Sequence, residues 1–372
     1  MALRKARAAI ASVSEVEAVA EEILGRGNAV DAVVAGVFAA CAISPGVLLG
    51  PVQLLVGGAG AGLLAIDGRV RQPGIGAPRP RGFTTAAEIP DAARVGVPWL
   101  PAAMSVAIAT MGTATFNQVI APSVALAKGT PRKDVLARIA SRGPSALEER
   151  PLSIELLASA GRPSGGLLTP DDLASARPDL QKATVVDLAS AQPEARRPTP
   201  GRGRAITMSA ELARKKSAEG QPTSRVLVTF PWTHVENERP APPAHEVEVA
   251  RLRVVAAVDR NATFAIACWD DAADSLLVPE LGLRAPFSAE PVRRGQTRVR
   301  PGDPRPAAGA VAMLGTAAAP ELVLSAFGAS DAYDVLSQAI DSLVADDRIE
   351  AHGEARLIAL AHAHGTASAL RG

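Results

Sequence analysis

One continuous apolar segment constrains the fold more than any other part of this sequence. Residues 29–43 contain a single charged side chain, Asp31, near the start. Asn28 is suited to cap the first turn of a helix, and the helix dipole favours a carboxylate three residues later. A helix that is apolar on every side must be buried on every side, and this one is too short to span a bilayer. The segment therefore predicts a buried core helix.

The composition provides a large core for such a helix. The chain has 372 residues, of which 48% are hydrophobic but only 3% aromatic, so small aliphatic side chains must fill most of the interior. Basic residues (39) balance acidic residues (38), and this balance excludes a strong overall field for nucleic acid or an acidic membrane. Cys41 and Cys268 both lie in apolar runs, which favours two buried free thiols over a disulfide.

The first residues argue against a targeting segment. Arg4, Lys5 and Arg7 are followed by an apolar stretch, residues 8–13, that is too short for a signal peptide, and acidic residues begin at Glu15. The sequence therefore predicts a cytoplasmic protein, with a periplasmic or secreted location as the alternative if a leader has been removed.

Local patterns predict two strand pairs and a second capped helix. Residues 54–69 contain two apolar runs joined by the glycine-rich stretch 57–62, which indicates a hairpin. Residues 254–268 are read as two strands with a turn at 259–261. Thr169, Pro170 and Asp172 form the sequence pattern of a capping box with proline at the first helical position.

Taken in chain order, these segments resemble the gamma-glutamyltranspeptidase family. Residues 27–35 resemble its opening helix, 165–173 its G-G-x-x-T-x-x-D-L segment, and 322–330 the strand and glycine turn of its oxyanion hole. The resemblance implies an α+β fold, the four-layer αββα sandwich of the N-terminal nucleophile hydrolases. It further implies three regions within one compact domain. These are a large-subunit-like region (1–187), a Pro/Arg-rich linker region (188–244) and a small-subunit-like region (245–372).

The resemblance also defines where the chemistry should be. Enzymes of the family cut their own chain before a threonine, whose hydroxyl then attacks an amide while the freed amine acts as base. The register of residues 254–268 places Leu252 at that position, and leucine has no hydroxyl. We therefore expect an uncleaved and inactive relative. If the alignment slips, Thr233 or Thr223 becomes the nucleophile of a divergent amidohydrolase or gamma-glutamyl transferase acting on glutathione or a similar amide.

The substrate-binding positions are partly retained. In the family, the arginine of a D-x-R motif holds the substrate α-carboxylate, and Arg69 matches it, although Asp67 can neutralise Arg69 instead. The oxyanion turn keeps one glycine, Gly328, followed by Ala329. The resemblance implies a gamma-glutamyl compound or another small carboxylate as ligand, and a protein partner, such as an active paralogue, or a second copy as partner. Neither nucleic acid, membrane nor cofactor is expected.

No functional site is predicted in two further stretches of the sequence. The basic segment 196–216 is read as linker rather than as an anion-binding patch, because no aromatic residues interleave with its charges. The C-terminal part is expected to contain helices at 333–343 and around 355–364. His362 and His364 would then lie on different faces of a helix, so no metal site is predicted there.

Overall fold

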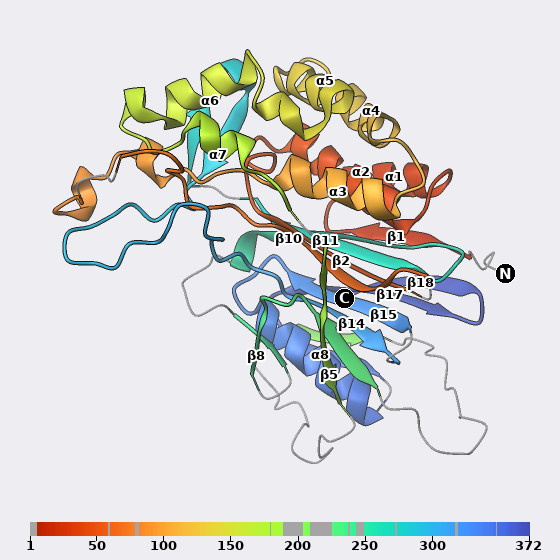
Figure 1. The fold of residues 1–372 in the computed structure, drawn as a ribbon. Helices are drawn as coiled ribbons and strands as arrows, with labels where there is room; N and C mark the ends of the chain where they lie inside the picture. The colour runs from red at the N-terminus through yellow and green to blue at the C-terminus, as the bar shows by residue number, and fades with distance from the viewer. Residues whose placement is uncertain are drawn as a thin grey trace.

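Two six-stranded antiparallel sheets form the centre of the molecule (Figure 1). The computed structural model describes residues 6–58, 60–78, 82–178, 180–188, 204–208, 225–236, 239–242, 249–271, 274–316, 319–346 and 348–372. The first sheet has the strand order β1 (Ala8–Ala11), β10 (Leu252–Val258), β11 (Phe264–Asp270), β2 (Val52–Gly58), β3 (Gly62–Gly68) and β4 (Leu180–Lys182). The second has the order β18 (Thr366–Arg371), β17 (Arg356–Ala363), β15 (Pro320–Phe327), β14 (Val311–Gly315), β7 (Val226–Thr229) and β5 (Thr184–Asp187).

Helices pack against these sheets, and three strand pairs complete the described fold. The helices are α1 (Ser14–Leu24), α2 (Ala29–Ile43), α3 (Leu100–Met111), α4 (Phe116–Leu126), α5 (Arg132–Arg142), α6 (Leu152–Ala160), α7 (Pro170–Ala174) and α8 (Ala332–Asp346). The pairs are β12 (Ser275–Val278) with β13 (Leu283–Pro286), β16 (Ile349–Gly353) with β6 (Arg204–Met208), and β8 (His234–Glu236) with β9 (Arg239–Ala241). Figure 1 shows α1–α5 above the first sheet and α8 below the second.

The alternation of side chains along β10 shows how the core is divided. Val255 and Ala257 belong to the cluster formed with α2, whereas Leu252, Val254 and Ala256 belong to the cluster shared with the second sheet. Successive residues of a strand point to opposite faces, so β10 is buried on both sides. Its neighbours on either side are β1 and β11, which makes it an inner strand.

The apolar helix predicted from the sequence is α2, and its start is strongly fixed. Asn28 and Asp31 form a capping box. Asp31 is fully buried, and its carboxylate also accepts hydrogen bonds from the Thr113 hydroxyl (2.6 Å) and the Thr113 N–H (3.1 Å). A single buried carboxylate thus joins the first turn of α2 to the segment between α3 and α4. The Thr169–Asp172 capping box at the start of α7 is also confirmed.

One predicted helix is wrong. Residues 356–363 form β17 rather than a helix, and His364 lies in the following turn with a positive φ of 50°. Helix α8 is confirmed. Within the region expected as linker, β7 pairs with both β14 and β5 and so belongs to the second sheet. The basic segment 196–216 lies outside the described residues apart from β6.

Two other predictions concern the cysteines and membrane-spanning helices. Cys41 and Cys268 are free and buried, as predicted. Burial raises the pKa of both thiols well above its usual value, which leaves them protonated. Among the helices of the described part of the chain, we find none that is both long and apolar enough to cross a membrane.

Candidate functional site

The head of β10 is the position where the resemblance places a nucleophile. Leu252 is the first residue of this inner strand, follows directly on a short 3-10 helix, η6 (Val249–Arg251), and is fully buried. The carbonyl oxygen of Arg251 accepts a hydrogen bond from the Asp271 N–H (3.3 Å). The peptide bond before Leu252 therefore continues the pairing of β10 with β11. The Leu252 side chain points into the core between the sheets.

A row of side chains crosses the first sheet next to Leu252. Strand register aligns Val254 with Cys268, Cys268 with Gln53, and Gln53 with Asp67. Gln53 and Asp67 are 2% and 4% exposed, so both polar groups are removed from water. A buried polar group is costly unless it is hydrogen-bonded, and the partners of these two residues define the site.

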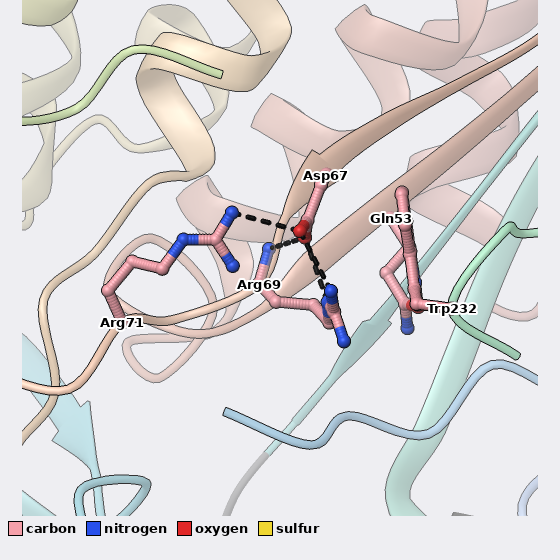
Figure 2. Close-up of polar contacts among 5 residues, drawn as sticks. All are labelled: Gln53, Asp67, Arg69, Arg71 and Trp232. Carbon is pink, nitrogen blue, oxygen red and sulfur yellow. Dashed lines mark hydrogen bonds and ion pairs between the residues drawn. The ribbon is translucent and has the colours of Figure 1, made fainter. Parts of the chain in front are cut away.

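The Asp67 carboxylate is shared by two arginines (Figure 2). Arg69 grips it with Nε (2.9 Å) and Nη2 (2.9 Å), and Arg71 donates its Nη2 to the same carboxylate (2.9 Å). Burial alone would raise the pKa of Asp67, but the hydrogen bonds from Arg69 and the charges of both arginines outweigh it and hold this pKa below its usual value. One carboxylate thus faces two guanidinium groups, which leaves one positive charge in excess.

Each guanidinium also lies against an indole. The Arg69 guanidinium carbon is 4.7 Å from the ring centroid of Trp232, and that of Arg71 is 3.9 Å from the ring centroid of Trp99. Such cation–π contacts are worth more where the cation is removed from water. The Nη1 of Arg71 and the Nε1 of Trp99 are both buried without a hydrogen-bond partner among the described residues.

Trp232 connects the arginines to Gln53. Its Nε1 donates to Gln53 Oε1 (2.5 Å), and its ring stacks on Phe230 at a centroid distance of 5.5 Å. Gln53 in turn donates to the carbonyl oxygen of Ala308 (2.6 Å). The Arg69 guanidinium carbon therefore lies over the Trp232 ring, while Asp67 accepts from the Nε and Nη2 of the same guanidinium (Figure 2).

Side chains of the protein also form hydrogen bonds with the backbone of Ala308 and Gly309. The Ala308 carbonyl oxygen accepts a hydrogen bond from Gln53, and the Gly309 N–H donates to the Tyr333 hydroxyl (2.8 Å). Burial raises the pKa of Tyr333, so it stays a neutral phenol. The expected oxyanion turn follows β15, with Gly328 in a left-handed conformation (φ 84°) and Ala329 packed against the hydrophobic cluster that includes the second sheet and α8.

The two alternative nucleophiles are placed differently. Thr233 lies in the turn between β7 and β8, and its N–H donates to the Phe230 carbonyl oxygen (3.0 Å). It precedes a strand of a two-stranded sheet rather than an inner strand of a six-stranded sheet. Thr223 lies outside the described residues.

Sequence reasoning found Asp67 and Arg69 but missed Gln53, Arg71 and Trp232. One signal was available for Gln53, which is the only polar side chain between Pro51 and Gly57. A lone polar residue in a buried strand must have a partner. No local pattern connects Trp232 to Gln53, because 179 residues separate them.

No metal centre accompanies this cluster in the part of the chain that the structure describes. The described residues contain no group of three histidine, cysteine or acidic side chains placed to hold an ion. The cluster around Asp67 presents guanidinium, amide and indole groups, which bind anions and stack on planar groups.

Comparison with known proteins supports the fold. No protein-family model matches the chain, and no curated protein sequence matches it. A structure titled LmbA2991HD is 15% identical, with a TM-score of 0.66 over 100% of this chain and 97% of the other. Cephalosporin acylase from Bacillus halodurans is 14% identical, with a TM-score of 0.63 over 92% of this chain and 81% of the other.

A gamma-glutamyltranspeptidase from Pseudomonas nitroreducens overlaps 49% of the chain, with 21% identity and a TM-score of 0.43. The likeness to the cephalosporin acylase and to LmbA2991HD extends over nearly the whole chain. At 14–15% identity it establishes architecture and not activity. The protein therefore has a mixed α/β fold with antiparallel sheets, similar to that of the cephalosporin acylase and of LmbA2991HD.

Proposed function

We propose that this protein is an uncleaved and catalytically inactive relative of the gamma-glutamyltranspeptidases that binds a small carboxylate. In this proposal its sheets and helices stack as the four-layer αββα sandwich of the N-terminal nucleophile hydrolases. The observation that carries the proposal is Leu252, buried at the head of the inner strand β10. An alkyl side chain can neither attack an amide nor cut the chain before itself.

The cluster around Asp67 supports the binding part of the proposal. A buried guanidinium group, that of Arg71, and a part-buried one, that of Arg69, share one carboxylate, so a monoanionic ligand would balance the remaining charge. Because Asp67 takes Nε and Nη2 of Arg69, a ligand carboxylate would either use the remaining amino groups or displace Asp67. The nearby Trp232 ring adds a planar apolar surface next to Arg69 for the rest of such a ligand.

The first test is the mass of the purified full chain. We expect one species of 38.1 kDa under denaturing conditions, and no release of anilide from a gamma-glutamyl anilide. Two fragments whose smaller member begins at Thr233 or Thr223 would reject the inactive form and establish the divergent hydrolase or transferase. Thr233→Ala would then abolish the cleavage if Thr233 were the nucleophile.

The second test addresses the ligand. Glutamate and other small carboxylates should raise the melting temperature of the wild type by mass action. Arg69→Ala should remove the shift, because a charged hydrogen bond contributes about 1.5–3 kcal/mol to binding. Arg132→Ala is the control, since this arginine bonds to the carbonyl oxygens of Ala42 and Gly282, away from the cluster. Equal shifts in wild type and Arg69→Ala would exclude a ligand at Arg69.

A further inference from the structure

A largely apolar cavity lies between α6 and α7, which are neighbours in Figure 1. Its volume is about 770 Å³, within the range of sites for drug-sized molecules. Most of its lining comes from α6 and from residues 161–163 and 166–170, and residues 77–78 add a further wall. Neither Arg69 nor Trp232 lines it. The cavity is therefore separate from the carboxylate site proposed above.

Helix α6 is apolar on two sides, and only one of them packs into the core. The core side is spaced at four-residue intervals and is buried, with the members Leu152, Leu156 and Ala160. The other side has residues three and four apart that share a face and line the cavity, namely Ile154, Leu157 and Ala158. Ile154 is 45% exposed. A ligand that covered this side would gain the free energy of removing apolar surface from water.

Hydrogen bonds hold the walls of the cavity in place without a ligand. The Thr169 hydroxyl donates to the Ile75 carbonyl oxygen (2.9 Å), and the Asp172 carboxylate accepts from the Ile75 N–H (2.9 Å). These bonds join the start of α7 to the segment that leads into the further wall. At the end of α6, the Leu168 N–H donates to the Ala160 carbonyl oxygen (3.2 Å). Walls fixed before binding lose less freedom when a ligand arrives.

Arg162 is the only charged side chain among the described residues that line this cavity. It is exposed, and it has neither an ion pair nor a side-chain hydrogen bond with another residue of the described chain. The neighbouring acidic residues, Glu155 and Asp171, lie outside the lining, and the Asp171 carboxylate lies against Gly76. An arginine can lay its alkyl stem on an apolar surface while its guanidinium stays in water. The cavity thus combines an apolar surface with one unpaired cation.

We propose that this cavity binds an amphipathic carboxylate, a molecule with an extended hydrocarbon body and one anionic head group, such as a medium-chain fatty acid. The apolar side of α6 contacts the body, and Arg162 pairs with the carboxylate, which matches its planar guanidinium. The inference goes beyond the proposed function, since it depends neither on a ligand at Arg69 nor on the absence of cleavage.

Calorimetric titration of the full chain with decanoate, below its critical micelle concentration and at constant ionic strength, tests the proposal. Hexanoate has the same head group and a shorter chain. Each buried CH₂ strengthens binding by up to about fourfold, so decanoate should bind at least about tenfold more tightly than hexanoate. Decyltrimethylammonium has the same chain and the opposite charge, and it should bind at least about threefold more weakly than decanoate.

Two pairs of variants locate the ligand. Ile154→Gln should weaken decanoate binding by about fivefold or more, because it removes apolar contact and buries an amide. Its control is Leu126→Gln, since Leu126 is 39% exposed at the end of α4 and does not line the cavity. Arg162→Gln should weaken binding by about three- to fivefold, the upper range of an exposed ion pair. Its control is Arg138→Gln, an exposed arginine of α5 outside the lining. Both controls should change the affinity by less than about 1.5-fold.

Four results would overturn the proposal. The first is failure of decanoate to bind the wild type, and the second is equally tight binding of decyltrimethylammonium. The third is an equal loss in the cavity variants and their controls, which would indicate general surface adsorption. The fourth is an equal loss in Arg69→Ala, which would place decanoate at the other site. Equal melting temperatures of the variants check that none has lost its fold.

Discussion

The Asp67 cluster and the head of β10 lie in the same sheet but have opposite character. Around Asp67, two arginines, two indoles and a glutamine form a network of charge-assisted hydrogen bonds and stacking contacts. At the head of β10, Leu252 lies in an apolar core. A site can keep groups that bind while it lacks the group that reacts. In the proposed function the first region binds the ligand and the second lacks the group that would react, and the following substitutions test each side of this contrast.

Removal of the shared carboxylate should have the largest effect. Asp67→Ala leaves two guanidinium groups, 14% and 8% exposed, without their counter-ion. An uncompensated buried charge costs about 3–5 kcal/mol of unfolding free energy. Urea denaturation measures the loss. As a control, Asp346→Ala changes an exposed carboxylate at the end of α8 and should stay within about 0.5 kcal/mol. A similar small change in Asp67→Ala would mean that solvent reaches the cluster.

The elements that sequence predicted best are those fixed by neighbouring residues. Asn28 and Asp31 are three residues apart, and both halves of their capping box follow from that spacing. The same holds for Thr169 and Asp172 at α7. Strand β17 was mistaken for a helix because its sequence, rich in alanine and leucine, has a weak strand preference of its own. Pairing with β15 and β18 on either side determines its conformation.

Only part of the candidate site could be predicted from the sequence, for the same reason. Asp67 and Arg69 are two residues apart, so their contact could be proposed as the alternative to a ligand. The contact of Arg69 with Trp232 depends on how β7 and the turn after it reach the first sheet. Such long-range contacts follow from tertiary packing and leave no local pattern. The strand that begins at Leu252 could be predicted from the apolar runs of residues 254–268, whereas the alignment of Leu252 with a nucleophile rests on the resemblance.

The same carboxylate should contribute to the pH dependence of stability. The pKa of Asp67 is lowered in the folded state, so its contribution is fully present above the pKa of the unfolded state. It is lost as the pH falls below about 4 and through the folded-state pKa. The free-energy difference between wild type and Asp67→Asn should thus be constant near neutral pH and narrow in acid. A difference that stays unchanged on acidification would contradict the lowered pKa.

At the head of β10, Leu252→Thr introduces a hydroxyl group at the expected nucleophile position but changes no other residue of the site. It should lower the unfolding free energy by about 2–4 kcal/mol, because it removes buried apolar volume and buries a hydroxyl. Leu252→Met, of similar volume, should cost less than about 1.5 kcal/mol. We expect neither cleavage nor amide hydrolysis in either variant. Cleavage of the threonine variant before residue 252 would show that only the nucleophile is missing, and the contrast between the two regions would reduce to one side chain.

The smallest expected effect isolates the link between Trp232 and Gln53. Trp232→Phe keeps an aromatic ring over Arg69 and Phe230 but removes the Nε1–H that donates to Gln53 (2.5 Å). One neutral hydrogen bond contributes about 1 kcal/mol, so the unfolding free energy should fall by about that amount. Trp232→Ala also loses the stacking and the cation–π contact, and should be less stable than Trp232→Phe by about 1 kcal/mol or more. Equal stabilities of the two variants would mean that the ring contributes only its N–H, and that Arg69 is held by Asp67 alone.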